Sequence, residues 1–177
     1  MRLLKVLKNN SFIRKIYKDK NIYFTGISSF TGLSALSSFH YNFSELSDYT
    51  LLLGSFGATS VLVYGFPNAP FSQPKNVIGG NLISSTIGIS ALKLTEMGMI
   101  DTYLAVPLSV SLSTMIMLKT DTVHPPAGGT AMIAAMGAGC ISNMGYSFIV
   151  PTFLGSSFLY SSSFMYPTQG PEHLLIW

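Results

Sequence analysis

The sequence has few charged side chains. Lysine, arginine, aspartate and glutamate make up 10% of its 177 residues, whereas hydrophobic residues make up 48%. A soluble globular domain carries roughly 25% charged residues. The composition therefore excludes such a domain and predicts an integral membrane protein, whose main partner is the lipid bilayer. We expect no nucleic-acid partner.

Cysteine and histidine are also scarce. The lone cysteine, Cys140, cannot form an internal disulfide. The three histidines are too scattered to predict a metal site, and the sequence contains neither a nucleophile elbow nor a phosphate-binding loop. We therefore expect no enzyme activity, no metal and no cofactor.

Basic residues are concentrated at the N-terminus. Residues 1–20 hold Arg2, Lys5, Lys8, Arg14, Lys15, Lys18 and Lys20, with Asp19 as the one acid. Basic residues close to the first span favour the cytoplasmic or equivalent side of the membrane. They therefore predict that the N-terminus lies on that side. We interpret residues 1–21 as a basic amphipathic segment on the membrane surface. A transit peptide is the alternative, and the identity of the membrane stays open.

The remaining chain alternates between apolar segments and short connections. Apolar segments lie at about residues 22–39, 49–66, 76–92, 102–118, 126–141 and 146–165. Since a spanning helix needs about 20 residues, they predict an all-α fold, a multi-pass transmembrane bundle of five or six apolar segments over residues 22–165. Residues 166–177 form an interfacial tail. The charges predict that 1–20, 67–75 and 119–124 share the inner side, opposite 41–48 and 94–101.

The segment that starts near residue 126 has unusually small side chains. Between Ala127 and Gly139 only Met132, Ile133 and Met136 are bulky. Such a helix offers little surface to lipid but lets neighbouring backbones approach closely. We expect it at the centre of the bundle, or between the subunits of a homo-oligomer.

A histidine, two prolines and two glycines precede or begin this helix. Pro125 and Pro126 lack an N–H group, which costs nothing in a first helical turn. The residue before a proline avoids the helical conformation, so His124 is expected outside the helix, at its exposed mouth. Beside it, the free N–H groups of residues 127–129 at the positive end of the helix dipole would form a seat for a small anion. The alternative is that the prolines and glycines only end one helix and begin the next.

A similar pattern opens the segment near residue 76, where Pro74 leads to a second glycine pair. Both helices should point their N-termini to the same side of the membrane, and their positive ends would make that side attractive to anions. The positive-inside rule alone would also explain the lysines near these two helix starts. The candidate substrate-binding residues are His124, Pro125, Pro126, Ala127, Gly128, Gly129 and Thr130 in one block, and Lys75, Asn76, Gly79, Gly80 and Asn81 in the other.

These two blocks carry a resemblance to a known family. His124-Pro125-Pro126 with residues 127–131, preceded by a block over 54–59, 65–70 and 72–80, resembles the HPP family of integral membrane proteins over about residues 22–165. The family usually has arginine where Lys75 stands, often histidine where Asn81 stands, and alanine for one of the paired glycines. Family descriptions often count four spans, fewer than the segments found here.

The resemblance implies a small multi-pass transporter, since plant and cyanobacterial relatives are associated with nitrite transport. Together with the anion seat, it predicts transport of a small monovalent inorganic anion, with nitrite as the first candidate. His124, whose ordinary pKa is near 6.5, is the candidate for proton coupling. The alternative is a non-transporting membrane subunit or assembly scaffold.

Overall fold

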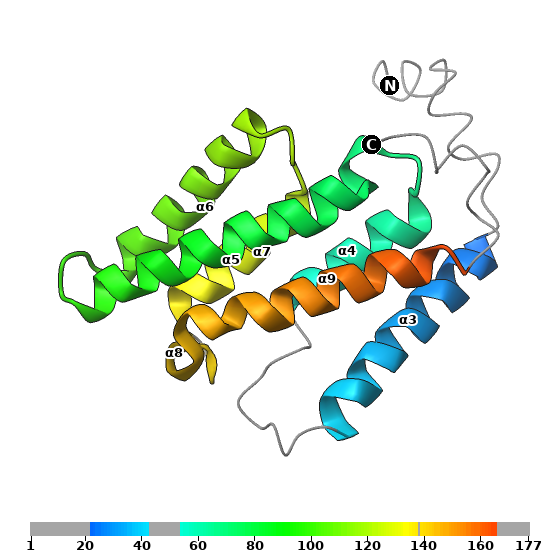
Figure 1. The fold of residues 1–177 in the computed structure, drawn as a ribbon, viewed down its shortest axis with the longest axis horizontal. Coiled ribbons are helices and arrows are strands. Elements are labelled where there is room, and N and C mark those ends of the chain that lie inside the picture. Colours follow the sequence, from blue (N-terminus) through cyan, green and yellow to red (C-terminus); the bar gives the residue numbers. More distant parts are fainter. Residues whose placement is uncertain (1–21, 43–53, 138, 166–177) are drawn as a thin grey trace, which may run out of the picture.

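The computed structural model describes residues 22–42, 54–137 and 139–165, and the regular structure in these ranges is helical. The elements are α3 (Ile22–Asn42), α4 (Gly54–Gly65), the 3-10 turn η2 (Pro70–Ser72), α5 (Pro74–Glu96), α6 (Thr102–Lys119), α7 (Pro125–Met136), α8 (Ile141–Met144), η3 (Gly145–Phe148) and α9 (Ile149–Ser163). The predicted all-α bundle is confirmed (Figure 1). The predicted segments 1–21 and 166–177, and most of 41–48, lie outside the described residues.

Helix α5 lies at the centre of the bundle and packs against α6, α7 and α9 (Figure 1). Its closest approach is to α7. A Cβ atom added to Gly88 would lie 2.5 Å from Cβ of Ala134 and 2.6 Å from the carbonyl oxygen of Ala131. Because backbone atoms cannot turn aside as the end of a long side chain can, any larger residue at this position would push the two helices apart.

The prediction that the small-residue helix lies inside the bundle is confirmed. Helix α7 contacts α4, α5 and α6, and its side chains Ala127, Ala131, Ala134 and Ala135 are fully buried. Its exposed side carries Met136. The alanines therefore serve close packing within the chain.

Helices α5 and α7 run in the same direction. Gly80 lies against His124 near their starts, and Leu92 lies against Gly137 near their ends. Because the two helices are parallel, their N-termini lie at the same end of the bundle, as the repeated sequence pattern predicted. Both helices begin with proline. Connections 66–73 and 120–124 meet at this end, where Lys75 Nζ and Asp121 Oδ2 are 2.5 Å apart. The connection between α5 and α6 lies at the other end (Figure 1).

The segment expected over residues 126–141 ends early. Helix α7 stops at Met136 because Gly137 adopts a left-handed backbone (φ 61°), a common way to end a helix. The chain bends by 87° between Pro125–Met136 and Ile141–Ser163, which makes this pair a broken span or a re-entrant loop. Among the described residues, α5 and α6 are long and apolar enough to cross a membrane, and the bent pair adds at most a third span. Fewer helices meet this criterion than the five or six predicted segments.

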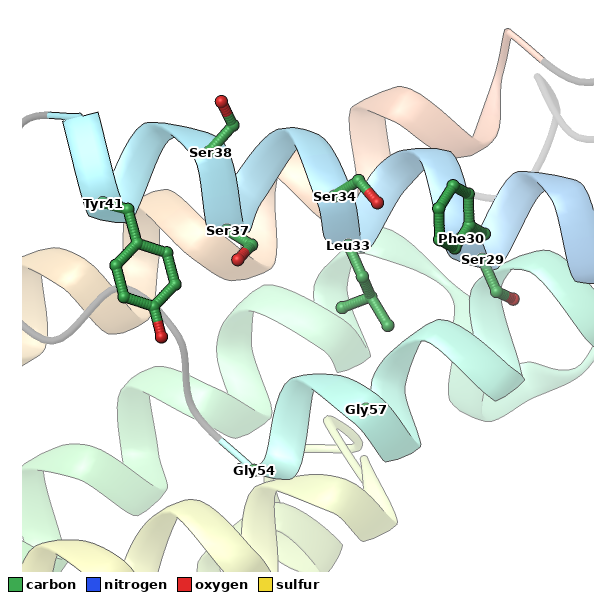
Figure 2. A pocket seen from close by; sticks show the side chains of 9 residues that line it. All are labelled: Ser29, Phe30, Leu33, Ser34, Ser37, Ser38, Tyr41, Gly54 and Gly57. Atoms are coloured by element: carbon green, nitrogen blue, oxygen red, sulfur yellow. The ribbon is translucent and has the colours of Figure 1, made fainter.

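Helix α3 contacts α4 and α9. An open cleft of about 900 Å³ lies between α3 and α4, where Leu33 of α3 points toward Gly57 of α4 and Ser34 and Ser37 also line the space (Figure 2). Near the end of α4, the hydroxyl oxygens of Tyr64 and Ser162 lie 2.6 Å apart and join α4 to α9. None of the predicted site residues lines the cleft.

The arrangement of the connections predicts a labelling pattern. Asn68, Thr120 and Met97 are exposed, the first two at the end where α5 begins and the third at the opposite end. In a Cys140→Ala background, single cysteines at Asn68 and Thr120 should react with an impermeant maleimide from one face of sealed vesicles, and a cysteine at Met97 from the other. Labelling of Asn68 and Met97 from the same face would contradict the bundle orientation.

Candidate functional site

His124 connects the two candidate blocks. Its backbone is extended (φ −132°, ψ 100°) and α7 begins at the next residue, as expected before a proline. Its side chain, however, is fully buried. The prediction that His124 stands at an exposed mouth is therefore wrong. The physical reason is that α4 and the η2 turn, which are distant in the sequence, cover the imidazole.

The imidazole is held from two sides. Its Nδ1 lies 2.8 Å from the carbonyl oxygen of Phe71, and its Nε2 lies 2.9 Å from Oγ1 of Thr59. A carbonyl oxygen can only accept, so Nδ1 carries the proton and donates it to Phe71. In the neutral ring, Nε2 then accepts the hydroxyl proton of Thr59. Both nitrogens of His124 are satisfied without a charge.

Burial also decides the charge of the ring. His124 lies in the connection before α7. Desolvation by burial lowers the pKa of its side chain from 6.5 to about 4, although the hydrogen bond to the carbonyl oxygen of Phe71 opposes the shift. The imidazole is therefore neutral at pH 7. Protonation near neutral pH, as the sequence analysis expected, requires a negative charge beside the ring.

The first turn of α7 offers fewer free donors than predicted. The N–H of Ala127 donates to the carbonyl oxygen of His124 at 2.9 Å, so this group is not available to a ligand. Gly128 and Gly129 have more room, since the nearest atom to an added Cβ would be 3.9 Å away in Val110 and 3.6 Å away in Ser55, respectively. A methyl group would fit at either position in ordinary van der Waals contact, so this glycine pair is not required for a close contact between helices.

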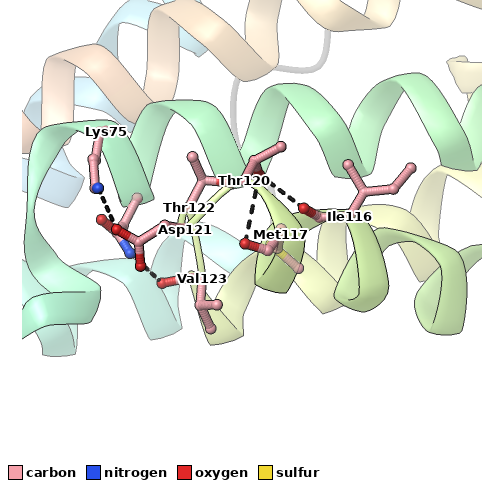
Figure 3. Close-up of polar contacts among 8 residues, drawn as sticks. Lys75, Ile116, Met117, Thr120, Asp121, Thr122 and Val123 are labelled. Carbon is pink, nitrogen blue, oxygen red and sulfur yellow. Dashed lines mark hydrogen bonds and ion pairs between the residues drawn. The ribbon is translucent and has the colours of Figure 1, made fainter.

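The start of α5 is tied to the connection that leads into α7 (Figure 3). Lys75 forms the ion pair with Asp121, and Nδ2 of Asn76 donates to the carbonyl oxygen of Val123 at 2.8 Å. Both side chains of the ion pair are largely exposed. The charge of Lys75, a predicted substrate-binding residue, is therefore offset by an acid 46 residues later in the chain.

A second buried polar cluster lies further along α5 and α7. Nδ2 of Asn81 donates to the carbonyl oxygen of Val77, which fixes the amide, and Oγ1 of Thr130 lies 2.8 Å both from Oδ1 of Asn81 and from Oγ of Ser55. Thr130 has one hydroxyl proton and Oδ1 can only accept, so Thr130 donates to Asn81, and the Ser55 hydroxyl is the donor to Thr130. This cluster joins α4, α5 and α7 without any ionised group.

The two glycines at the start of α5 have a packing role. A Cβ atom on Gly80 would lie 2.8 Å from Cβ of His124 and 2.9 Å from the carbonyl oxygen of Thr122, and one on Gly79 would lie 3.1 Å from Thr122. Gly80 thus allows the connection before α7 to lie against α5. Of the two prolines that open α7, Pro125 is exposed and Pro126 is buried.

The structure thus brings the two predicted blocks together through Asn76, Gly80 and Asn81. Sequence reasoning missed Ser55 and Thr59 as partners of the site. Both lie within the block 54–59 that carried the family resemblance, but no local pattern in that block indicates contacts with residues 65 and 75 positions later in the chain. No group of three histidine, cysteine, aspartate or glutamate side chains that could hold a metal ion occurs in the described part of the chain.

Comparisons with known proteins identify the family of this chain. The family profile described as "HPP, transmembrane region" matches residues 15–170. Two curated transmembrane proteins of Dictyostelium discoideum are each 36% identical, over 118 and 130 residues, which is 67% and 73% of this chain. The matches cover 41% and 42% of those relatives, so the chain spans about two fifths of their length. No solved structure matches.

The glycine geometry predicts different effects of an alanine substitution on stability at two positions. Gly80→Ala should destabilise the protein by about 1–3 kcal/mol, because its Cβ would overlap His124 and a backbone oxygen. Gly128→Ala, with Val110 no nearer than 3.9 Å, should leave stability unchanged or raise it slightly. Thermal unfolding in detergent measures both. Equal stability of the two variants would contradict the close contact at Gly80.

The buried imidazole also predicts how stability depends on pH. The pKa of His124 is lower in the folded protein, about 4, than the 6.5 of an unfolded chain, so its contribution is complete above pH 6.5 and is lost as pH falls toward 4. The thermal midpoint should fall across this interval, and His124→Gln, which does not titrate, should show a shallower fall. The same slope in both proteins would show that His124 is exposed or already charged.

Proposed function

The chain belongs to the HPP family of transmembrane proteins, and we propose that it transports a small monovalent anion, with nitrite as the first candidate. The anion would pass His124, where the starts of α5 and α7 meet; we call this place the junction. One observation carries the proposal: α5 and α7 are parallel, and their proline-led N-termini lie side by side over buried polar groups. Helix N-termini bear partial positive charge, so two of them together favour an anion.

The neutral character of the junction supports the same proposal. His124, Asn81, Thr59 and Thr130 are fully buried. In a membrane protein, such polar groups are costly unless they are paired, and they often line a substrate path. Here each has a partner, so the junction is stable without a ligand. Its hydroxyls can rotate, however, and offer protons to an anion that enters beside Gly128 and Gly129.

Proton coupling follows from the hydrogen bonds of the imidazole. An anion near His124 would favour the charged ring and raise its pKa above the value of about 4. The added proton binds Nε2, which changes from acceptor to donor, and the Thr59 hydroxyl rotates from donor to acceptor. Anion and proton would then enter together. The ion pair of Lys75 and Asp121 at the surface contributes little net attraction.

A scaffold remains the alternative, with one observation in its favour. The small residues of α5 and α7 are covered inside the chain, but the serine- and glycine-lined cleft between α3 and α4 is open. A homo-oligomer stays a prediction for the same reason, since small residues allow close helix contacts. A scaffold needs no titratable group at His124, which separates it from a transporter.

Transport can be tested with the purified protein in liposomes. Wild-type protein should carry nitrite faster than protein-free vesicles, and flux should rise as pH falls from 8 toward about 4 because His124 gains its proton over that range. His124→Ala should reduce flux about tenfold, which corresponds to about 1.4 kcal/mol of lost interaction with the anion, or flatten the pH dependence. Gly128→Leu should reduce flux, because its side chain exceeds the methyl-sized room at this position and would cover the helix start.

Ser142→Ala is a matched control for these variants. Its hydroxyl donates to Oε1 of Glu96 at 2.8 Å, at the end of the bundle opposite His124, so its loss should leave nitrite flux unchanged. Flux should be expressed per correctly inserted molecule. Unchanged flux and pH dependence in His124→Ala would remove the imidazole from the mechanism, and no flux in wild type would favour the scaffold.

A further inference from the structure

Two buried serines have no hydrogen-bond partner. In the described part of the chain, four buried side-chain polar atoms lack one: Oε1 of Gln73 and the hydroxyl oxygens of Ser84, Ser113 and Ser157. Ser84 and Ser113 are fully buried. A helical serine normally bonds a carbonyl one turn back, as Ser85 does to Leu82 at 3.1 Å. An unpaired buried hydroxyl is unfavourable, so two of them call for an explanation.

The contacts between α5, α6 and α7 place these two serines at the same height along the bundle. On one side of them, Gly80 of α5 lies against Met117 of α6, with 3.2 Å between an added Cβ and the methionine sulfur. On the other side, Gly88 and Ser109 both reach Ala131 of α7, the first with an added Cβ at 2.6 Å and the second with its hydroxyl at 3.3 Å from the carbonyl oxygen. Ser84 lies midway between Gly80 and Gly88, and Ser113 midway between Met117 and Ser109.

The antiparallel helices α5 and α6 therefore meet in three successive layers. The first holds Gly80, Met117 and His124, and the third holds Gly88, Ser109 and Ala131. The middle layer holds the two unpaired hydroxyls. One layer is four residues, about 6 Å, from the next along a helix. The middle layer thus lies about 6 Å further into the bundle than His124.

We propose that the hydroxyls of Ser84 and Ser113 form a second binding station for a small anion, one layer beyond His124. This inference rests on the proposed function and adds a step to it. Each hydroxyl has a proton to donate, and two donors from facing helices can hold one small anion between them. The neighbouring layers carry no permanently charged side chain, since His124 is neutral until an anion enters, so hydrogen bonds and not a fixed charge hold the anion at Ser84 and Ser113. It can therefore also leave.

Nitrite titrations of the purified full chain in detergent test this station. The thermal midpoint of the wild type should rise with nitrite, and the half-saturating concentration gives an apparent Kd. Ser84→Ala and Ser113→Ala should each raise that Kd roughly tenfold, because each removes one hydrogen bond to a charged group. Without nitrite, both variants should be at least as stable as wild type, since each loses an unpaired buried hydroxyl.

Ser85→Ala is the matched control. Ser85 is next to Ser84 and buried, but its hydroxyl is already bonded to the carbonyl oxygen of Leu82, so its loss should leave the Kd for nitrite unchanged. A lower thermal midpoint of Ser84→Ala and Ser113→Ala without nitrite would show that the hydroxyls have structural partners, and would overturn the proposal.

The remaining outcomes separate the station from the proposed function. An unchanged Kd in both serine variants, with a raised Kd in His124→Ala, would overturn the station and leave transport standing, with the hydroxyls bonded to water only. A Kd that rises in the serine variants, without nitrite flux in wild-type liposomes, would support the station and contradict transport. No shift of the wild-type midpoint with nitrite, nitrate, formate or chloride would overturn the station, and nitrite flux in wild-type liposomes would then decide on transport separately.

Discussion

The close parallel contact between α5 and α7 is the constraint on which the other features depend. Gly80 and Gly88 allow it, because any side chain at either position would overlap atoms of the facing segment. The contact fixes the two helix starts at one end of the bundle. It also leaves His124 no space toward α5, so that its ring points to α4 and η2, where Thr59 and the Phe71 carbonyl satisfy it. Packing of small residues thus determines the polar site.

A second consequence is that the site works with neutral groups. Among the described residues, the ion pair near the site, between Lys75 and Asp121, lies at the surface, and the buried members are an imidazole, amides and hydroxyls. Neutral donors can bind an anion without holding it too tightly for release. A fixed buried charge would be costlier in a bilayer and would slow release. Among the described members of this site, the His124 ring is the group whose charge the proposed anion could change.

The sequence predicted the elements better than the contacts between them. Proline at residues 74 and 125 marked two helix starts correctly, and the alanines of α7 indicated its central position, because both signals are local. The burial of His124 and the pairing of Lys75 were not predictable, since Thr59 and Asp121 are 65 and 46 residues away in the chain. The early end of α7 was missed because a glycine within a small-residue run does not by itself reveal a left-handed backbone.

The central claim is that His124 is a buried, neutral imidazole that gains a proton when a small anion enters the junction. The most direct measurement is 15N NMR of histidine-labelled protein in lipid near pH 7, with the His124 signals assigned by comparison with His124→Gln. Without nitrite, Nδ1 should be protonated and Nε2 should be an unprotonated acceptor, and saturating nitrite should protonate Nε2 as well. A ring already charged without nitrite, a proton on Nε2 alone, or signals that do not respond to nitrite would contradict the claim.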